Sequence, residues 1–219
     1  MNATWTVREP DPTDVMRLQA DGHDALVARL LALRGFGEVA AARNFLTPQL
    51  RDLPDPHTMA DCQAAAELLV RAIQAGQSIC VYGDYDVDGI SAAALLHDIL
   101  AMAGPAPRVF LPDRMRDGYG LRMERLQELA DAGVQVFISA DCGSTAVAEV
   151  AAMRARGCAF IICDHHALGP ESPPANCHLN PRRPDCRYPD KNLCAVGVAM
   201  VLAQAFRRAA GLRGLTTAA

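Results

Sequence analysis

Residues 78–91 read SICVYGDYDVDGIS, and this stretch decides the fold. Its apolar first part predicts a buried strand, and the sequence from Ser91 onward predicts a helix. Three carboxylates lie between them at alternate positions, on Asp84, Asp86 and Asp88. Carboxylates this close repel one another unless a cation neutralises them, and hard divalent cations prefer such oxygen ligands. A solvated acidic turn is the simpler interpretation, but its place at the end of a buried strand favours a metal site.

The pattern D-x-D-x-D-G also opens the calcium-binding loop of helix-loop-helix proteins. That loop needs a glutamate at its twelfth position, and counting from Asp84 the twelfth residue is Leu95. A strand rather than a helix is expected before Asp84, so we exclude this class of site. Gly89 is expected to permit a sharp turn between the carboxylates and the helix that follows.

The 219-residue chain has a formal net charge of -4 and a hydrophobic fraction of 51%. This fraction is ample for a core, and the charge gives no global basic field for nucleic acid, although a local groove can still be basic. The eight cysteines form no C-x-x-C pair, so we expect reduced thiols in a cytoplasmic protein and no structural zinc site. No stretch is long enough to span a membrane, and we expect no membrane partner.

The order of apolar runs predicts an α/β fold with a small N-terminal helical leader. Residues 1–58 are the expected leader and linker, with a surface arm to about residue 20 and helices over 24–33 and 39–45. From residue 59 strands alternate with helices, which predicts a parallel sheet flanked by helices. The expected strands are residues 78–82, 108–111, 134–139 and 159–163, and the expected helices are 60–75, 91–102, 121–132, 145–156 and 194–210.

Two further strand ends carry potential metal ligands. The strand over 134–139 leads to Asp141, and the strand over 159–163 leads to Asp164, His165 and His166. A single aspartate after a strand usually caps a helix, and a single histidine is more often packed or solvated. Three acidic or histidine-rich strand ends in succession are harder to explain in that way. Because the carboxyl ends of parallel strands meet at one edge, we expect these groups to converge.

Carboxylate and imidazole ligands together suit Mn²⁺ or Mg²⁺, and the number of carboxylates predicts two ions. Two such ions about 3.5–4 Å apart stabilise the attacking and leaving oxygens of a phosphoryl displacement. The sequence therefore predicts hydrolysis of a phosphodiester. Without metal, the clustered carboxylates are expected to raise one another's pKa values, because like charges disfavour ionisation.

Three ordered motifs, YGDYDVDG (82–89), ADCG (140–143) and DHH (164–166), resemble the first three motifs of the DHH phosphoesterase superfamily. More narrowly, the segments at 111–121 (LPDRMRDGYGL) and 180–189 (NPRRPDCRYP) resemble those of the RecJ family of bacterial exonucleases. This resemblance implies a single-stranded-DNA-specific 5′→3′ exonuclease of DNA repair and recombination. It implies single-stranded DNA as the partner, with a single-strand-binding protein and a recombination helicase as further partners.

Two alternatives stay open at this point. One is a DHH phosphodiesterase that acts on short oligonucleotides or cyclic dinucleotides. Tyr82 argues against it, because many small-molecule members carry a histidine ligand where this chain has the tyrosine. The other is an inactive module that binds nucleic acid.

The resemblance also implies roles for single residues. The expected ligands of two Mn²⁺ or Mg²⁺ ions are Asp84, Asp86, Asp88, Asp141 and His165, with Asp141 bridging both ions. His166 is expected to face the scissile phosphate, and Asp164 to orient a histidine, so both count as catalytic. The expected contacts to the nucleic-acid backbone are Arg114, Arg116, Tyr119, Arg182 and Arg183, unless these residues belong to solvated loops.

The family's fourth motif, an aspartate after the helix over 194–210, has no counterpart here. Residues 211–219 read GLRGLTTAA. The DHH domain over 59–219 is therefore expected to be incomplete at its C-terminus and to lack the family's second domain. With fewer ligands, this chain alone is expected to bind Mn²⁺ weakly and to turn over slowly or not at all.

Overall fold

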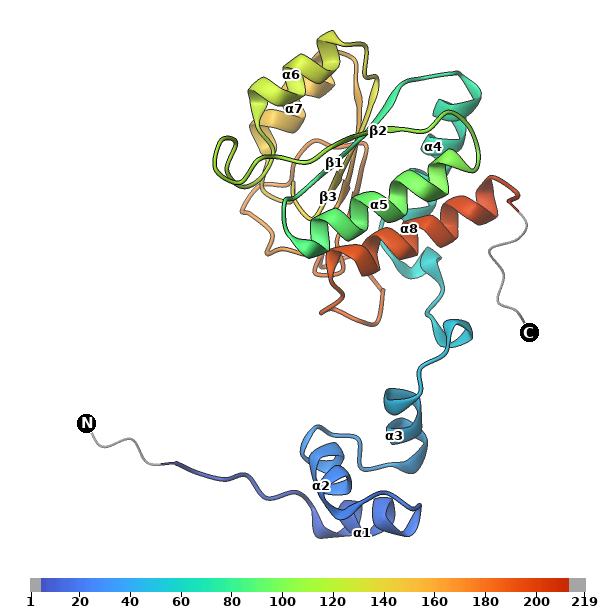
Figure 1. Ribbon diagram of the computed structural model, residues 1–219, viewed down its shortest axis with the longest axis vertical. Helices are drawn as coiled ribbons and strands as arrows, with labels where there is room; N and C mark the ends of the chain where they lie inside the picture. The colour runs from blue at the N-terminus through green and yellow to red at the C-terminus, as the bar shows by residue number, and fades with distance from the viewer. Residues whose placement is uncertain (1–4, 213–219) are drawn as a thin grey trace. The chain divides into compact units, whose positions relative to one another are not determined.

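The structure, a computed structural model, describes residues 5–212 (Figure 1). The chain divides into two units, one that reaches to Leu53 and one that begins at Pro54. Residues 1–4 of the expected surface arm and residues 213–219 of the expected DHH domain lie outside the described residues.

The first unit is a small group of helices. It contains α1 (Pro12–Ala20), α2 (Ala25–Leu33), α3 (Val39–Leu46) and the 3-10 helix η1 (Leu50–Asp52). The expected arm is wrong for the residues of α1, because Pro12 stands at the start of a helix and the Asp11 side chain caps it by accepting from Thr13 N at 2.8 Å. A proline at this position starts a helix readily, since its missing N–H is not needed there.

The second unit is an α/β domain with a five-stranded parallel sheet. The strand order is β2-β1-β3-β4-β5. The strands are β1 (Ile79–Gly83), β2 (Arg108–Phe110), β3 (Val136–Ala140), β4 (Ala159–Cys163) and β5 (Cys177–Leu179). The helices are the 3-10 helix η2 (Pro56–Thr58), α4 (Cys62–Gln74), α5 (Val87–Ala101), α6 (Met123–Asp131), α7 (Val147–Ala155) and α8 (Ala195–Ala209). The predicted parallel sheet flanked by helices is confirmed.

Alternate residues of β1, β3 and β4 enter two different cores. Val81 and Ile138 pack in the core that includes residues of α4, α5 and α8, whereas Phe137 and Phe160 pack in the core that includes residues of α6 and α7. Figure 1 shows these two groups of helices on opposite sides of the sheet. Burial on both faces explains why the strands read as continuous apolar runs rather than as alternating ones.

Two elements differ from the sequence prediction. The strand β5 was not expected, because it has only three residues and no helix separates it from β4. The helix α5 begins at Val87, four residues before the expected start. The Asp86 side chain caps this early start by accepting from Asp88 N and Gly89 N, each at 3.0 Å.

Gly89 lies inside α5 and does not form the expected turn. A Cβ atom at this position would lie 2.6 Å from Asp84 N and 2.7 Å from Asp84 O. The glycine is therefore needed for space, because it lets the first turn of α5 approach the backbone at the end of β1.

The order in which the strands are laid down reverses beside β1. From β1 the chain passes to β2 on one side and then returns to β3 on the other side. In open α/β sheets, ligands bind beside the carboxyl ends of the strands where the order reverses in this way. Here that point lies between the ends of β1 and β3. Among residues 5–212, no helix combines the length and the apolar character that crossing a membrane requires.

Gly89→Ala tests the close approach of α5 to Asp84. The added Cβ would meet backbone atoms that cannot turn aside, so we expect the free energy of unfolding to fall by about 1–3 kcal/mol in urea denaturation. Gly197→Ala in α8 is the matched control, because its Cβ would meet only the Leu193 side chain. Equal losses in the two variants would contradict the argument.

Candidate metal centre

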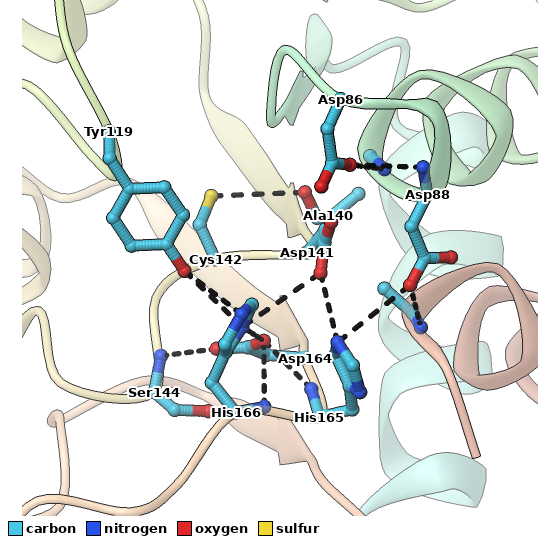
Figure 2. Close-up of polar contacts among 12 residues, drawn as sticks. Asp86, Asp88, Tyr119, Ala140, Asp141, Cys142, Ser144, Asp164, His165 and His166 are labelled. Atoms are coloured by element: carbon cyan, nitrogen blue, oxygen red, sulfur yellow. Dashed lines mark hydrogen bonds and ion pairs between the residues drawn. The ribbon is translucent and has the colours of Figure 1, made fainter.

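Two groups of potential metal ligands lie at the carboxyl ends of β1, β3 and β4. Figure 2 shows four of their residues, Asp86, Asp141, His165 and His166. One group contains Asp84, Asp86 and Asp141, and the other contains Asp141, His165 and His166. Within each group the potential ligand atoms lie within 4.8 Å of one another. The structure therefore brings together the three strand ends that were predicted to converge, and Asp141 belongs to both groups.

Asp141 lies between the two groups in an unusual environment. It is buried, with an exposed fraction of 2%, and its φ of +68° is in the left-handed region. Such a conformation costs on the order of 1–3 kcal/mol for a residue other than glycine and is often found at functional sites. Its Oδ1 has no hydrogen-bond partner and lies 3.3 Å from His165 Nε2. Burial, followed by the charges of Asp88 and Asp86, raises the pKa of Asp141 to about 8.

Asp84 and Asp86 differ in their surroundings. Asp84 is buried, its N–H donates to Ala140 O at 3.1 Å, and its Oδ1 has no hydrogen-bond partner. Burial, aided by the charge of Asp86, raises the pKa of Asp84. Asp86 is exposed, and its pKa is lowered chiefly by the hydrogen bond from Gly89 N. The pKa values of Asp84 and Asp141 are thus raised as expected, although burial is a larger cause than like charge, and the expectation is wrong for Asp86, which stabilises the start of α5.

Asp88, in the first turn of α5, connects this helix to α8. Its Oδ2 accepts from Ala195 N and its Oδ1 accepts from Val196 N, each at 2.8 Å. Anions are favourable at this end of a helix, where backbone N–H groups lack partners. Asp88 Oδ2 also lies 3.7 Å from His165 Nε2, so this carboxylate borders the second ligand group without belonging to it.

Asp164 fixes the two histidines that follow it. Its Oδ1 accepts from His165 N and from His166 Nδ1, both at 2.7 Å, and its Oδ2 accepts from Ser144 N at 2.9 Å. Burial opposes ionisation, but the hydrogen bonds from His166 and Ser144 together hold the pKa of Asp164 below its usual range. The hydrogen bond to Asp164 in turn raises the pKa of His166. This arrangement fits the predicted orienting role of Asp164.

The five expected substrate contacts lie in different surroundings. The Tyr119 hydroxyl is 3.3 Å from both ring nitrogens of His166, so this residue borders the centre. Arg114 lies over the ring of Tyr85, 5.2 Å from its centroid. Arg116 and Arg182 are exposed.

Arg183 is held by protein groups. It pairs with Asp61 and Asp185 and donates to His178 O.

Tyr82 contributes no atom to either ligand group. Its hydroxyl accepts from Arg122 N at 3.3 Å and lies 3.4 Å from Gly120 O. Its ring packs on Phe110, with 4.8 Å between the centroids. Tyr82 therefore supports the segment that leads into α6.

Three polar residues of this region were not predicted, namely Ser144, His178 and Asn180. All three are buried, and they form hydrogen bonds that lead to Asp164 and His166. Asn180 follows β5, so recognising that short strand would have placed a fourth polar group at the same edge. Ser144 and His178 carry no comparable signal in the sequence.

The donor set fits divalent cations. Within each group, carboxylate oxygens or imidazole nitrogens of the kind that Mn²⁺ and Mg²⁺ accept lie close together. Among the described residues, two buried carboxylate oxygens have no hydrogen-bond partner, Asp84 Oδ1 and Asp141 Oδ1, and both belong to residues of these groups. Buried charged oxygens are costly unless they are paired or bind a metal, so a cation would satisfy both.

Comparison with known proteins finds relatives that are described as single-stranded-DNA-specific exonucleases. The single-stranded-DNA-specific exonuclease RecJ of Bacillus subtilis (strain 168) is 36% identical over 92% of this chain and 26% of its own length. The RecJ of Escherichia coli (strain K12) is 34% identical over 83% of this chain and 31% of its own length. This chain thus spans about a quarter to a third of these relatives. They do not favour the alternative of a phosphodiesterase for short oligonucleotides.

A solved structure and a family model agree with this result. The crystal structure of RecJ in complex with Mn²⁺ from Thermus thermophilus is similar to this chain with a TM-score of 0.75 and 30% identity. The similarity covers 95% of this chain and 29% of that one. The model of the DHH family, N-terminal domain, matches residues 78–217, which include β1 to β5 and both ligand groups. With more than half of its length matched by this model, the chain belongs to the DHH family.

Proposed function

We propose that this chain carries the catalytic centre of a single-stranded-DNA-specific 5′→3′ exonuclease that hydrolyses phosphodiester bonds with two metal ions. The observation that carries the proposal is the pair of ligand groups that share Asp141 at the carboxyl edge of the sheet. The similarity to single-stranded-DNA-specific exonucleases supports the substrate, and the direction of cleavage is inferred from the resemblance to the RecJ family.

The proposed ions are Mn²⁺ or Mg²⁺. Asp84, Asp86 and Asp141 would hold one ion, and Asp141 and His165 would hold the other with Asp88 beside them. When bound, two such ions stabilise the attacking and leaving oxygens of a phosphoryl displacement. The relative from Thermus thermophilus was solved with Mn²⁺, which supports this choice.

His166 and Asp164 act on the phosphate side of the centre. Asp164 accepts the hydrogen bond from His166 Nδ1 and so fixes the orientation of the ring. The other ring nitrogen, Nε2, then donates to a non-bridging oxygen of the scissile phosphate. Because Asp164 is an anion, it also favours the protonated imidazole that an anionic substrate requires.

Residues of the segments between β2 and α6 and after β5 hold single-stranded DNA. Arg114 and Arg116 belong to the exposed segment between β2 and α6, and Tyr119 extends from the same segment to His166. Arg182 lies on the segment after β5 and is exposed. We assign Arg183 a weaker role toward DNA, because its guanidinium already pairs with two carboxylates.

The biological setting is part of the proposal. We place the protein in the cytoplasm, in DNA repair and recombination, with a single-strand-binding protein and a recombination helicase as partners. The free state of all eight cysteines, seven of them buried, is consistent with a reducing compartment. The partners are supported by the resemblance to the RecJ family alone.

Binding of Mn²⁺ is expected to raise the melting temperature, because the ion binds only the folded ligand groups. At a concentration 100 times the dissociation constant, the gain is about 2.7 kcal/mol. Asp141→Asn should abolish this gain while raising the melting temperature without metal by a few degrees, since it removes a buried carboxylate and asparagine tolerates the left-handed conformation. Asp98→Asn, at an exposed carboxylate of α5, is the control. An unchanged Mn²⁺ effect in Asp141→Asn would contradict the proposed centre.

Nuclease activity is tested with oligonucleotides labelled at the 5′ or the 3′ end, in Mn²⁺. We expect slow release of nucleotides from the 5′ end of single strands and no cleavage of duplexes or dinucleotides. His166→Ala should lower the rate by about 100-fold or more, whereas His97→Ala in α5 should not change it. Binding of DNA without any cleavage would favour the inactive module, and equal rates for His166→Ala and the parent chain would refute the assigned role.

Arg114→Gln and Arg183→Gln separate DNA contacts from structural ones. Arg114→Gln should weaken binding of single strands and reduce the slope of log K against log salt by about 0.7, as expected for one lost phosphate contact. Arg183→Gln should instead lower the melting temperature, because it leaves Asp61 and Asp185 without their partner. The opposite pattern of effects would reverse the two assignments.

A further inference from the structure

Asn180 occupies a fourth strand end at the same edge of the sheet, directly after β5. It is fully buried, and its side chain has three partners. Nδ2 donates to Ser144 Oγ at 2.9 Å and to His166 O at 3.0 Å, and Oδ1 accepts from Arg182 N at 2.9 Å. Because both amide protons and the oxygen are engaged, the amide has one satisfied orientation.

Ser144 carries the contact from Asn180 to Asp164. Its N–H donates to Asp164 Oδ2 at 2.9 Å, and its Oγ lies 3.0 Å from His178 Nε2. Asp164 Oδ1 in turn accepts from His166 Nδ1 at 2.7 Å, and Figure 2 shows Ser144, Asp164 and His166 side by side. Asn180 therefore reaches His166 by two routes, directly through the backbone carbonyl and indirectly through Ser144 and Asp164.

The strand β5, which Asn180 follows, is also held by contacts from Asp61 and Arg183. The N–H of His178 in β5 donates to Asp61 Oδ2 at 3.0 Å, and Arg183 donates to the carbonyl of the same residue. Arg183 also pairs with Asp61, so the three groups are connected. A strand of three residues at the edge of a sheet has few ladder hydrogen bonds, and these side-chain contacts replace the missing ones.

We propose that Asn180 is a positioning residue for His166 and acts partly through Ser144. The imidazole of His166 is 44% exposed, so packing alone does not hold it. Its orientation depends on the Asp164 hydrogen bond and on the turn that contains its carbonyl, and Asn180 stabilises both. The consequence for the reaction rests on the proposed function, whereas the effect on the ring is a property of the folded chain alone.

The direct test measures the His166 ring by nitrogen-15 NMR of the 219-residue chain without metal. In Asn180→Ala we expect the His166 Nδ1 proton to exchange with water at least tenfold faster. Asn176→Ala is the control. Asn176 precedes β5, at the opposite end of the strand from Asn180, and its side chain accepts one backbone hydrogen bond, from Phe160 N at 2.8 Å. The control should leave the His166 signals unchanged. An unchanged His166 signal in Asn180→Ala, or the same change in both variants, would overturn the proposal.

Affinity for Mn²⁺ is the second readout, because Asp164, which Asn180 reaches through Ser144, also accepts from the backbone N–H of the proposed ligand His165. Loss of an outer hydrogen-bond partner typically weakens metal binding by about 10- to 100-fold. We expect a rise of this order in the dissociation constant for Asn180→Ala and a change below about twofold for Asn176→Ala. Equal affinity in the two variants would overturn the proposal. If the parent chain binds no Mn²⁺, the proposed function fails, and the NMR measurement still decides the role of Asn180.

Ser144→Ala provides a variant with less disturbance, in case Asn180→Ala does not fold. It removes the hydroxyl that accepts from Asn180 but keeps the backbone N–H that donates to Asp164. We expect faster exchange of the His166 Nδ1 proton, by a smaller factor than in Asn180→Ala. Exchange at the parent rate in Ser144→Ala would contradict the indirect route through Asp164.

Discussion

Concentrated negative charge at the carboxyl ends of β1, β3 and β4 is the constraint on which this structure depends. Buried carboxylates are costly unless hydrogen bonds or cations compensate them. Asp86 is compensated by backbone N–H groups of α5, Asp88 by those of α8, and Asp164 by the loop after β3 and by His166. One oxygen each of Asp84 and Asp141 is left without a partner. These two oxygens mark the place where the proposed cations would act.

The same charges organise the helices. Asp86 defines the start of α5, and Gly89 lets that start lie against the backbone of Asp84. Asp88 binds the first N–H groups of α8, and α5 and α8 share one core with α4. A carboxylate of the proposed centre is therefore also a support of the fold. Substitutions of Asp88 should for this reason affect folding as well as metal binding, unlike substitutions that remove only an unpartnered oxygen.

Much of the architecture could be predicted because buried parallel strands have a simple signature. The apolar runs that became β1, β3 and β4 were long enough to recognise, and each ended in an acidic residue. The helix α1 was missed because proline is more typical of irregular segments than of helices, although Pro12 stands at the first helical position, where it is tolerated. The strand β5 was missed because no helix separates it from β4, so it breaks the alternation of strands and helices on which the prediction rested. Because β5 was missed, the position of Asn180 at the same edge of the sheet was missed too.

The sequence by itself determined that the acidic and histidine side chains after β1, β3 and β4 meet, because the ends of parallel strands share one edge of the sheet. Only the tertiary structure decided how each carboxylate is used. Asp88 is bound by a backbone N–H 107 residues away, and Asn180 donates to a serine 36 residues away. The left-handed backbone of Asp141 likewise belongs to the packed structure. The physical reason is that hydrogen-bond partners far apart in the chain become neighbours only when the helices and strands pack, whereas strand ends follow from local apolar pattern.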